Sequence, residues 1–200
     1  MAATELMDDV DIATEVALDG LDDELYEVVD GKRVEKPPMS AYSVRIASRL
    51  IRKLGTFADA KGLGEVVSEM LFRLPLQEDL YRNRRPDLAY VSLARWPAGR
   101  AMPLKENAWD VVPDFAVEVM SPHDLAEGSL QKIHEYFQAG VQLVWIVYPE
   151  QREVYVYESP AKIRVLTTAD TLDGGTVLPE LQLRVDSLFD PVAPANQGSQ

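Results

Sequence analysis

The sequence predicts an α/β fold of the α+β kind, in which a mixed β-sheet carries two helices and flanking β-hairpins. A strand–helix–strand unit over residues 115–148 is typical of a right-handed parallel crossover. Asp30-Gly31, between two alternating runs, is a strong signal for a two-residue hairpin. A helical pattern over residues 41–60 adds a long helix ahead of the crossover unit.

Length and composition limit the class of protein. A chain of 200 residues, 46% hydrophobic and 26% charged, is typical of one soluble domain with a full core. No apolar run approaches the ~20 residues of a membrane span, and the N-terminus lacks the pattern of a secretory signal. The absence of cysteine excludes disulfides, thiolate nucleophiles and cysteine–zinc sites. We therefore expect a cytoplasmic protein without a membrane segment.

The net charge of -13 is concentrated at the N-terminus. Residues 1–30 hold 11 acids and no Lys or Arg, whereas the rest holds 22 acids against 20 bases. We predict a loosely ordered acidic segment over residues 1–22, a domain over 23–192 and a tail over 193–200. The segment is either a solvated leader or a nucleic-acid mimic that screens a basic surface.

The elements of the first half follow from turn and cap signals. The hairpin around Asp30-Gly31 ends at Pro37-Pro38, and Ser40 is suited to cap the helix over residues 41–60. Basic residues form one side of this helix, either as a solvated face or as a stripe that contacts phosphates: Arg45, Arg49, Arg52 and Lys53. Two strands are then expected, over 65–74 and 88–92, with a polar loop at 77–84 between them and a long connection over 93–112 after them.

The second half alternates between strands and a short helix. A strand is expected over 115–120, followed by a helix over 129–139 that ends at Gly140. Further strands are expected over 143–148, 153–158, 162–168 and 177–185, with a short segment over 187–190.

Glu118 is an acid in the middle of an otherwise apolar strand. Side chains alternate along a strand, so Phe115, Val117 and Val119 point one way and Glu118 the other. A buried unpaired charge is costly, so Glu118 needs a partner or a metal. Lys132, expected in the first turns of the next helix, is placed against the helix dipole and is a candidate partner.

Asp87 is a second acid at the start of an apolar strand. Two carboxylates on adjacent strands repel each other unless a cation lies between them, and oxygen-only ligands suit Mg²⁺ or Mn²⁺. Lys132 could then orient or help deprotonate a water and stabilise charge on a phosphate. Glu35, which ends the hairpin, either completes the metal shell or is a solvated strand-end residue.

Several other kinds of site are disfavoured. His123 and His134 are the only histidines and lack a third residue at metal spacing, which argues against zinc. No GxSxG, GxGxxG or Walker pattern is present, so serine hydrolysis and nucleotide cofactors are not indicated.

An ordered set of motifs carries a family resemblance. RPDLAYVS, VPDFAVEVMSP, a helix lysine followed by YFQAGV, and VWIVYPEQREVYVY resemble the Uma-two family, as do VVDGKRVEKPP and LPELQLRVDSLF. The resemblance covers about residues 24–190 and implies a restriction-endonuclease-like core of the PD-(D/E)XK superfamily. By it Asp87 is the motif aspartate and Glu118 the second acid. Met120 replaces the motif lysine, Lys132 matches the family's helix lysine, and Ser43 stands where the family often has histidine.

The resemblance implies a metal-dependent DNA endonuclease. Asp87, Glu118 and the backbone carbonyl of Val119 would hold Mg²⁺ or Mn²⁺, and Lys132 would position the attacking water. The alternative is a catalytically inactive nuclease-fold module that binds or regulates.

We also expect a homodimer, because two sites are needed to cut both strands of DNA together. Four aromatic residues could contribute to its interface unless the core takes them: Trp145, Tyr148, Tyr155 and Tyr157.

Overall fold

The structure is a computed structural model that describes residues 25–102, 104–122 and 126–191. The expected N-terminal segment over 1–22, the tail over 193–200 and His123 lie outside the described residues. Neither helix in the described ranges combines the length and apolar character that a membrane crossing requires.

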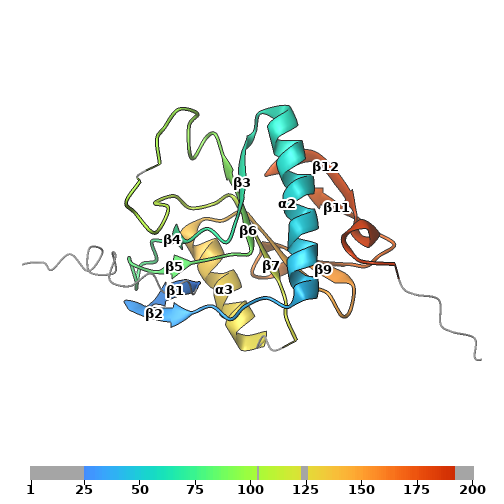
Figure 1. The fold of residues 1–200 in the computed structure, drawn as a ribbon, viewed down its shortest axis with the longest axis horizontal. Helices are drawn as coiled ribbons and strands as arrows, with labels where there is room; N and C mark the ends of the chain where they lie inside the picture. The colour runs from blue at the N-terminus through green and yellow to red at the C-terminus, as the bar shows by residue number, and fades with distance from the viewer. Residues whose placement is uncertain (1–24, 103, 123–125, 192–200) are drawn as a thin grey trace, which may run out of the picture.

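A mixed sheet forms the centre of the domain (Figure 1), as the sequence predicts. In the described part of the chain it has six strands in the order β10-β9-β8-β7-β6-β3. Their bounds are β3 Gly64–Ser68, β6 Leu88–Ser92, β7 Phe115–Val119, β8 Leu143–Tyr148, β9 Glu153–Ser159 and β10 Lys162–Leu166. The pair β7–β8 is parallel, from Phe115↔Leu143 to Val119↔Val147, and the other neighbours are antiparallel.

The two helices pack against opposite faces of this sheet. Helix α2, Ala41–Lys61, begins at the N-cap Ser40, whose hydroxyl accepts a hydrogen bond from the Ser43 N–H. Helix α3, Ala126–Ala139, supplies the crossover between β7 and β8. Phe115 and its alternate neighbours share a core cluster with the apolar side of α2, whereas Ala116 belongs to the cluster that contains the inner side of α3. Glu118 therefore lies on the α3 face.

The strands at the centre are buried on both faces, which explains their nearly continuous apolar sequence. Trp145 of β8 is fully buried and makes an edge contact with Phe115, with 4.7 Å between the ring centroids. Of the aromatic residues considered for a dimer interface, Trp145 and Tyr157 belong to the core, whereas Tyr148 and Tyr155 are half-buried and pack on each other. The dimer itself stays a prediction.

A smaller sheet lies beside α3 and has the order β2-β1-β5-β4 in the described residues (Figure 1). Its strands are β1 Tyr26–Val29, β2 Lys32–Glu35, β4 Phe72–Arg73 and β5 Asn83–Arg84. The expected hairpin joins β1 to β2, and Asp30 and Gly31 have φ of 51° and 69°, the left-handed pair that such a turn needs. This sheet brings β1 close to the site described below.

A third unit follows the main sheet near the C-terminus. Strands β11 Thr171–Gly174 and β12 Leu178–Arg184 form a hairpin, and a 3₁₀ turn, η1 Val185–Leu188, follows it. Leu172, Leu178 and Leu188 join the core cluster of α2.

The structure corrects the predicted elements in four places. The strand expected over 65–74 is two strands in different sheets, because Glu69 has a φ of 51° and interrupts the extended backbone. Helix α3 begins at Ala126 rather than at 129, and the sequence analysis missed β5 and β11. Lys132 therefore lies beyond the first turn of α3, and the argument from the helix dipole does not apply to it.

Candidate active site

Asp87 and Glu118 lie next to each other at one end of the antiparallel pair β6–β7. Asp87 directly precedes β6, and the pairing Leu88↔Val117 places it beside the end of β7. The Val119 N–H donates to Asp87 Oδ2 at 2.6 Å, so one carboxylate oxygen is held by the strand. Both side chains are buried, with 3% of Asp87 and 8% of Glu118 exposed. These two acids thus interrupt an otherwise apolar part of the sheet.

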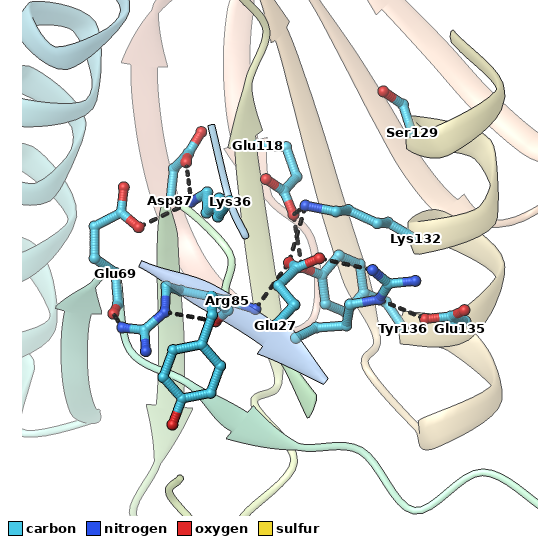
Figure 2. A network of polar contacts seen from close by, with 12 residues as sticks. Glu27, Lys36, Glu69, Arg85, Asp87, Glu118, Ser129, Lys132, Glu135 and Tyr136 are labelled. Atoms are coloured by element: carbon cyan, nitrogen blue, oxygen red, sulfur yellow. Dashed lines mark hydrogen bonds and ion pairs between the residues drawn. The ribbon is translucent and has the colours of Figure 1, made fainter. Parts of the chain in front are cut away.

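Two polar side chains of helix α3, four residues apart on the same face, contact Glu118. The Tyr136 hydroxyl donates to Glu118 Oε1 at 2.6 Å. Lys132 Nζ lies 3.7 Å from the same oxygen. Figure 2 shows Lys132 and Tyr136 both directed at Glu118. The structure thus brings Asp87, Glu118 and Lys132 to one side of the sheet.

Glu27 of β1 is a functional candidate that the sequence analysis missed. Its Oε1 lies 2.9 Å from Lys132 Nζ, closer than Glu118 does, and its Oε2 accepts from Arg84 Nη1 at 2.6 Å. Arg84 also donates from Nε to Glu135 of α3 at 2.6 Å. Burial raises the pKa of Glu27, but Lys132 and Arg84 outweigh burial and hold the pKa below its ordinary value. Glu27 is therefore an ionised residue that fixes the position of the Lys132 ammonium.

Lys36 is a second lysine at the site, and it follows directly after β2. Its Nζ lies 2.6 Å from Asp87 Oδ1 and 2.8 Å from Glu69 Oε2, between the two carboxylates in Figure 2. Burial lowers the pKa of Lys36, but Asp87, Glu118 and Glu69 outweigh it and raise the pKa above its ordinary value. The side chain is therefore a protonated ammonium at neutral pH.

The placement of Glu69 follows from its unusual backbone. The Glu69 N–H donates to the Asp87 carbonyl at 3.2 Å, and the Arg85 guanidinium donates to the Glu69 carbonyl. Arg85 also donates to the Tyr26 carbonyl at 3.1 Å, which ties the smaller sheet to this bend. The break between β3 and β4 thus serves to place a third carboxylate beside Asp87.

Burial disfavours the charged form of both carboxylates at the centre of the site. Burial raises the pKa of Asp87, and neither Lys36 nor the Val119 N–H brings it back to its ordinary value. Burial likewise raises the pKa of Glu118; Lys132 opposes this effect and Asp87 adds to it. A raised carboxyl pKa means that the ionised form is disfavoured, and a bound cation would relieve that cost.

The donor atoms fit a hard divalent cation with few protein ligands. The described residues contain no group of three or more His, Cys, Asp or Glu arranged to hold a metal. Mg²⁺ is often held by one or two carboxylates while water and substrate phosphates complete its shell. Asp87 and Glu118 meet that requirement. Because the N–H and C=O of one strand residue point to the same side, the Val119 carbonyl lies on the Asp87 side with its N–H. The ion pair between the Lys36 ammonium and Asp87 shows that this carboxylate binds a positive charge.

The remaining residues considered from sequence lie elsewhere or act structurally. Glu35 is exposed at the end of β2 and makes no described contact with Asp87 or Glu118; its neighbour Lys36 points inward instead. His134 is exposed on α3. Ser43 is buried, and its hydroxyl donates to the Met120 carbonyl at 3.1 Å, which ties α2 to the end of β7.

Two further groups have structural contacts that account for them. Asp114 accepts from the Ser92 N–H at 2.8 Å and pairs with Arg95, so it holds the start of β7. Arg49 of α2 donates to the Leu188 carbonyl at 2.9 Å and pairs with Asp190, which fixes the C-terminal turn rather than leaving Arg49 for a phosphate.

Comparison with known proteins points to one family. The model of the Uma2 family, described as "Putative restriction endonuclease", matches residues 16–186. A similar solved structure is the crystal structure of a "putative nuclease belonging to DUF820" from Anabaena variabilis ATCC 29413. It shares 19% sequence identity and a TM-score of 0.70, over 82% of this chain and 89% of that chain. This likeness confirms the nuclease fold expected from the sequence. No curated protein matches.

Proposed function

The chain belongs to the Uma2 family, and from that premise we propose that it is a metal-dependent DNA endonuclease that hydrolyses phosphodiester bonds. The family description supports a nuclease, and the site supports the metal dependence. The observation that carries the proposal is the pair of buried carboxylates, Asp87 and Glu118, with Lys132 Nζ at 3.7 Å from Glu118.

Each residue of the site has a distinct role in this proposal. Asp87, Glu118 and the Val119 carbonyl would hold Mg²⁺ or Mn²⁺, which would polarise the phosphate and lower the pKa of a water. Lys132 donates hydrogen bonds to the attacking water and to the phosphoryl oxygens, and its charge stabilises the negative charge that develops on them. Glu27 positions Lys132, and the Tyr136 hydroxyl fixes the Glu118 carboxylate.

Plasmid cleavage tests the activity. Supercoiled plasmid should be converted to nicked and linear forms in the presence of Mg²⁺ or Mn²⁺, and a chelator should stop the reaction. Lys132→Met should lower the rate at least about 100-fold, because it removes the ammonium that orients the water and stabilises the charge developing on the phosphoryl oxygens. Glu65→Gln is the matched control, since Glu65 is an exposed acid on the edge strand β3, and it should retain the wild-type rate.

A thermal-shift titration tests the metal site separately from cleavage. Mn²⁺ should raise the melting temperature of the wild type, because a ligand that binds only the native state stabilises it. Glu118→Gln should remove the shift and Glu65→Gln should preserve it. Equal shifts in wild type and Glu118→Gln would place the metal elsewhere and contradict the proposal.

The second candidate function is a nuclease-fold module that binds DNA without cutting it. The ion pair between Lys36 and Asp87 favours it, because this pair already neutralises one of the carboxylates. A protein that binds Mn²⁺ through Glu118 and binds DNA, yet leaves plasmid intact, would support the module over the enzyme.

A further inference from the structure

Lys36 occupies the position where a cation is expected. We propose that Lys36 is a tethered counter-ion, which fills the cation site of the metal-free protein and leaves Asp87 when a divalent ion binds. This inference rests on the metal site of the proposed function. It adds a regulatory element, because the Lys36 ammonium competes with the divalent ion for Asp87.

The competition follows from a shared atom. Asp87 Oδ2 is held by the Val119 N–H at 2.6 Å, which leaves Oδ1 as the oxygen with more lone-pair capacity for a cation. Lys36 Nζ lies on that oxygen at 2.6 Å, and its side chain is 9% exposed. A divalent ion on Oδ1 would lie within a few ångströms of the ammonium, where like charges in a partly buried site repel strongly. The ammonium and a divalent ion therefore compete for Asp87 Oδ1.

Lys36 has a second, more exposed partner with which the ammonium can stay paired after it leaves Asp87. Its second partner, Glu69, is 29% exposed and lies at the edge of the cluster, in contrast to the buried Asp87. The lysine side chain has a flexible four-carbon stem, so the ammonium can move off Asp87 while it keeps Glu69. Although its own side chain is mostly buried, Lys36 lies between two exposed segments, strand β2 and Pro37-Pro38. No movement of the central sheet is required.

Lys132 is not suited to this role. Its nearest carboxylate is Glu27 at 2.9 Å, and its contact with Glu118 is longer, at 3.7 Å. Glu27 is in turn held by its ion pair with Arg84, so Lys132 has a fixed partner. The two lysines are thus distinct: Lys132 is anchored on the side of α3, whereas Lys36 bridges an inner and an outer carboxylate.

The first experiment compares metal affinity with stability in Lys36→Met, which keeps the length of the side chain and removes the charge. Calorimetric titration with Mn²⁺ should show roughly tenfold tighter binding than in the wild type. The melting temperature of the metal-free variant should fall, because Asp87 and Glu69 lose their counter-ion. Lys162→Met, at an exposed lysine on β10, is the control and should leave the affinity unchanged. If Lys36 had a purely structural role, Lys36→Met would lower both the stability of the protein and its affinity for Mn²⁺.

The second experiment uses the wild type and detects displacement itself, so it holds even if Lys36→Met does not fold. An amine-reactive reagent should modify Lys36 slowly in the metal-free protein and several-fold faster when Mn²⁺ is saturating, as read by peptide mass spectrometry. Lys162 should react equally in both states. Glu118→Gln should abolish the metal-dependent increase.

The outcomes separate this inference from the proposed function. If Mn²⁺ binds in a way that Glu118→Gln removes, but Lys36 labelling does not rise and Lys36→Met binds no tighter, the counter-ion is wrong and the metal site stands. If Mn²⁺ binding does not depend on Glu118 in any variant, the metal site of the proposed function fails, and the counter-ion with it.

Discussion

Replacement of Glu27 by Gln tests how the site holds its lysine. The Glu27 carboxylate, 7% exposed, receives Arg84 Nη1 at 2.6 Å, Lys132 Nζ at 2.9 Å and the Arg85 N–H at 3.1 Å. Glutamine keeps the shape and removes the charge. Of its two ion pairs, Lys132 then retains the 3.7 Å contact with Glu118, whereas Arg84 retains its ion pair with Glu135.

The expected loss in the free energy of unfolding is about 3 kcal/mol, the lower end of the cost of breaking a buried ion pair, because Arg84 keeps its second partner. With a urea m-value of about 2 kcal/mol/M, the unfolding midpoint should fall by roughly 1.5 M. Glu65→Gln, at an exposed position on β3, should leave the midpoint unchanged.

The pH dependence of this loss follows from the lowered pKa of Glu27. A carboxyl group whose folded pKa lies below its unfolded value contributes stability that is fully present above the unfolded pKa. The difference between wild type and Glu27→Gln should therefore be complete at neutral pH. It should shrink as the pH falls below the ordinary value of 4.5 and through the lower folded pKa. A loss below about 1 kcal/mol at neutral pH would equal that of a surface pair and refute the reasoning.

Three further predictions concern the site, the leader and the assembly. Tyr136→Phe removes the 2.6 Å hydrogen bond to buried Glu118 and should cost about 2 kcal/mol in urea unfolding; an unchanged midpoint would contradict the contact. Deletion of residues 1–22 should leave DNA affinity unchanged if that segment is a solvated leader, whereas tighter binding, most visible at low salt, would show that it screens a basic surface. Light scattering at micromolar concentration should give the mass of a dimer, and a monomeric mass with and without DNA would favour a nicking enzyme or a non-cutting module.

The central strands could be predicted because their sequence and burial agree. The strands predicted over 88–92 and 143–148 match β6 and β8, since continuous apolar runs suit strands that are covered on both faces. The single strand expected over 65–74 was wrong at Glu69, whose positive φ depends on contacts with Asp87 and Arg85 far along the sequence. Strand β5 has two residues, too few for any periodicity.

The residues of the candidate site also fall into two groups: those that a local sequence pattern marks, and those that only the fold brings to the site. Asp87 and Glu118 could be singled out as candidates because each is an acid beside an apolar run. Glu27 carries the same signal within YEVV, so the pattern used for Glu118 would have found it. Lys36 lies among polar residues and prolines, and no local pattern separates it from the solvated Glu35 beside it. Its role depends on the fold bringing the end of β2 to Asp87, 51 residues away.

A crystal structure of the protein grown with Mn²⁺ tests the central claim most directly. The account predicts one anomalous peak between Asp87 and Glu118, about 2.1 Å from an oxygen of each, with Lys36 Nζ moved off Asp87 Oδ1. A peak bound elsewhere, or an Asp87 still paired with Lys36 at saturating Mn²⁺ and no metal on Glu118, would contradict it.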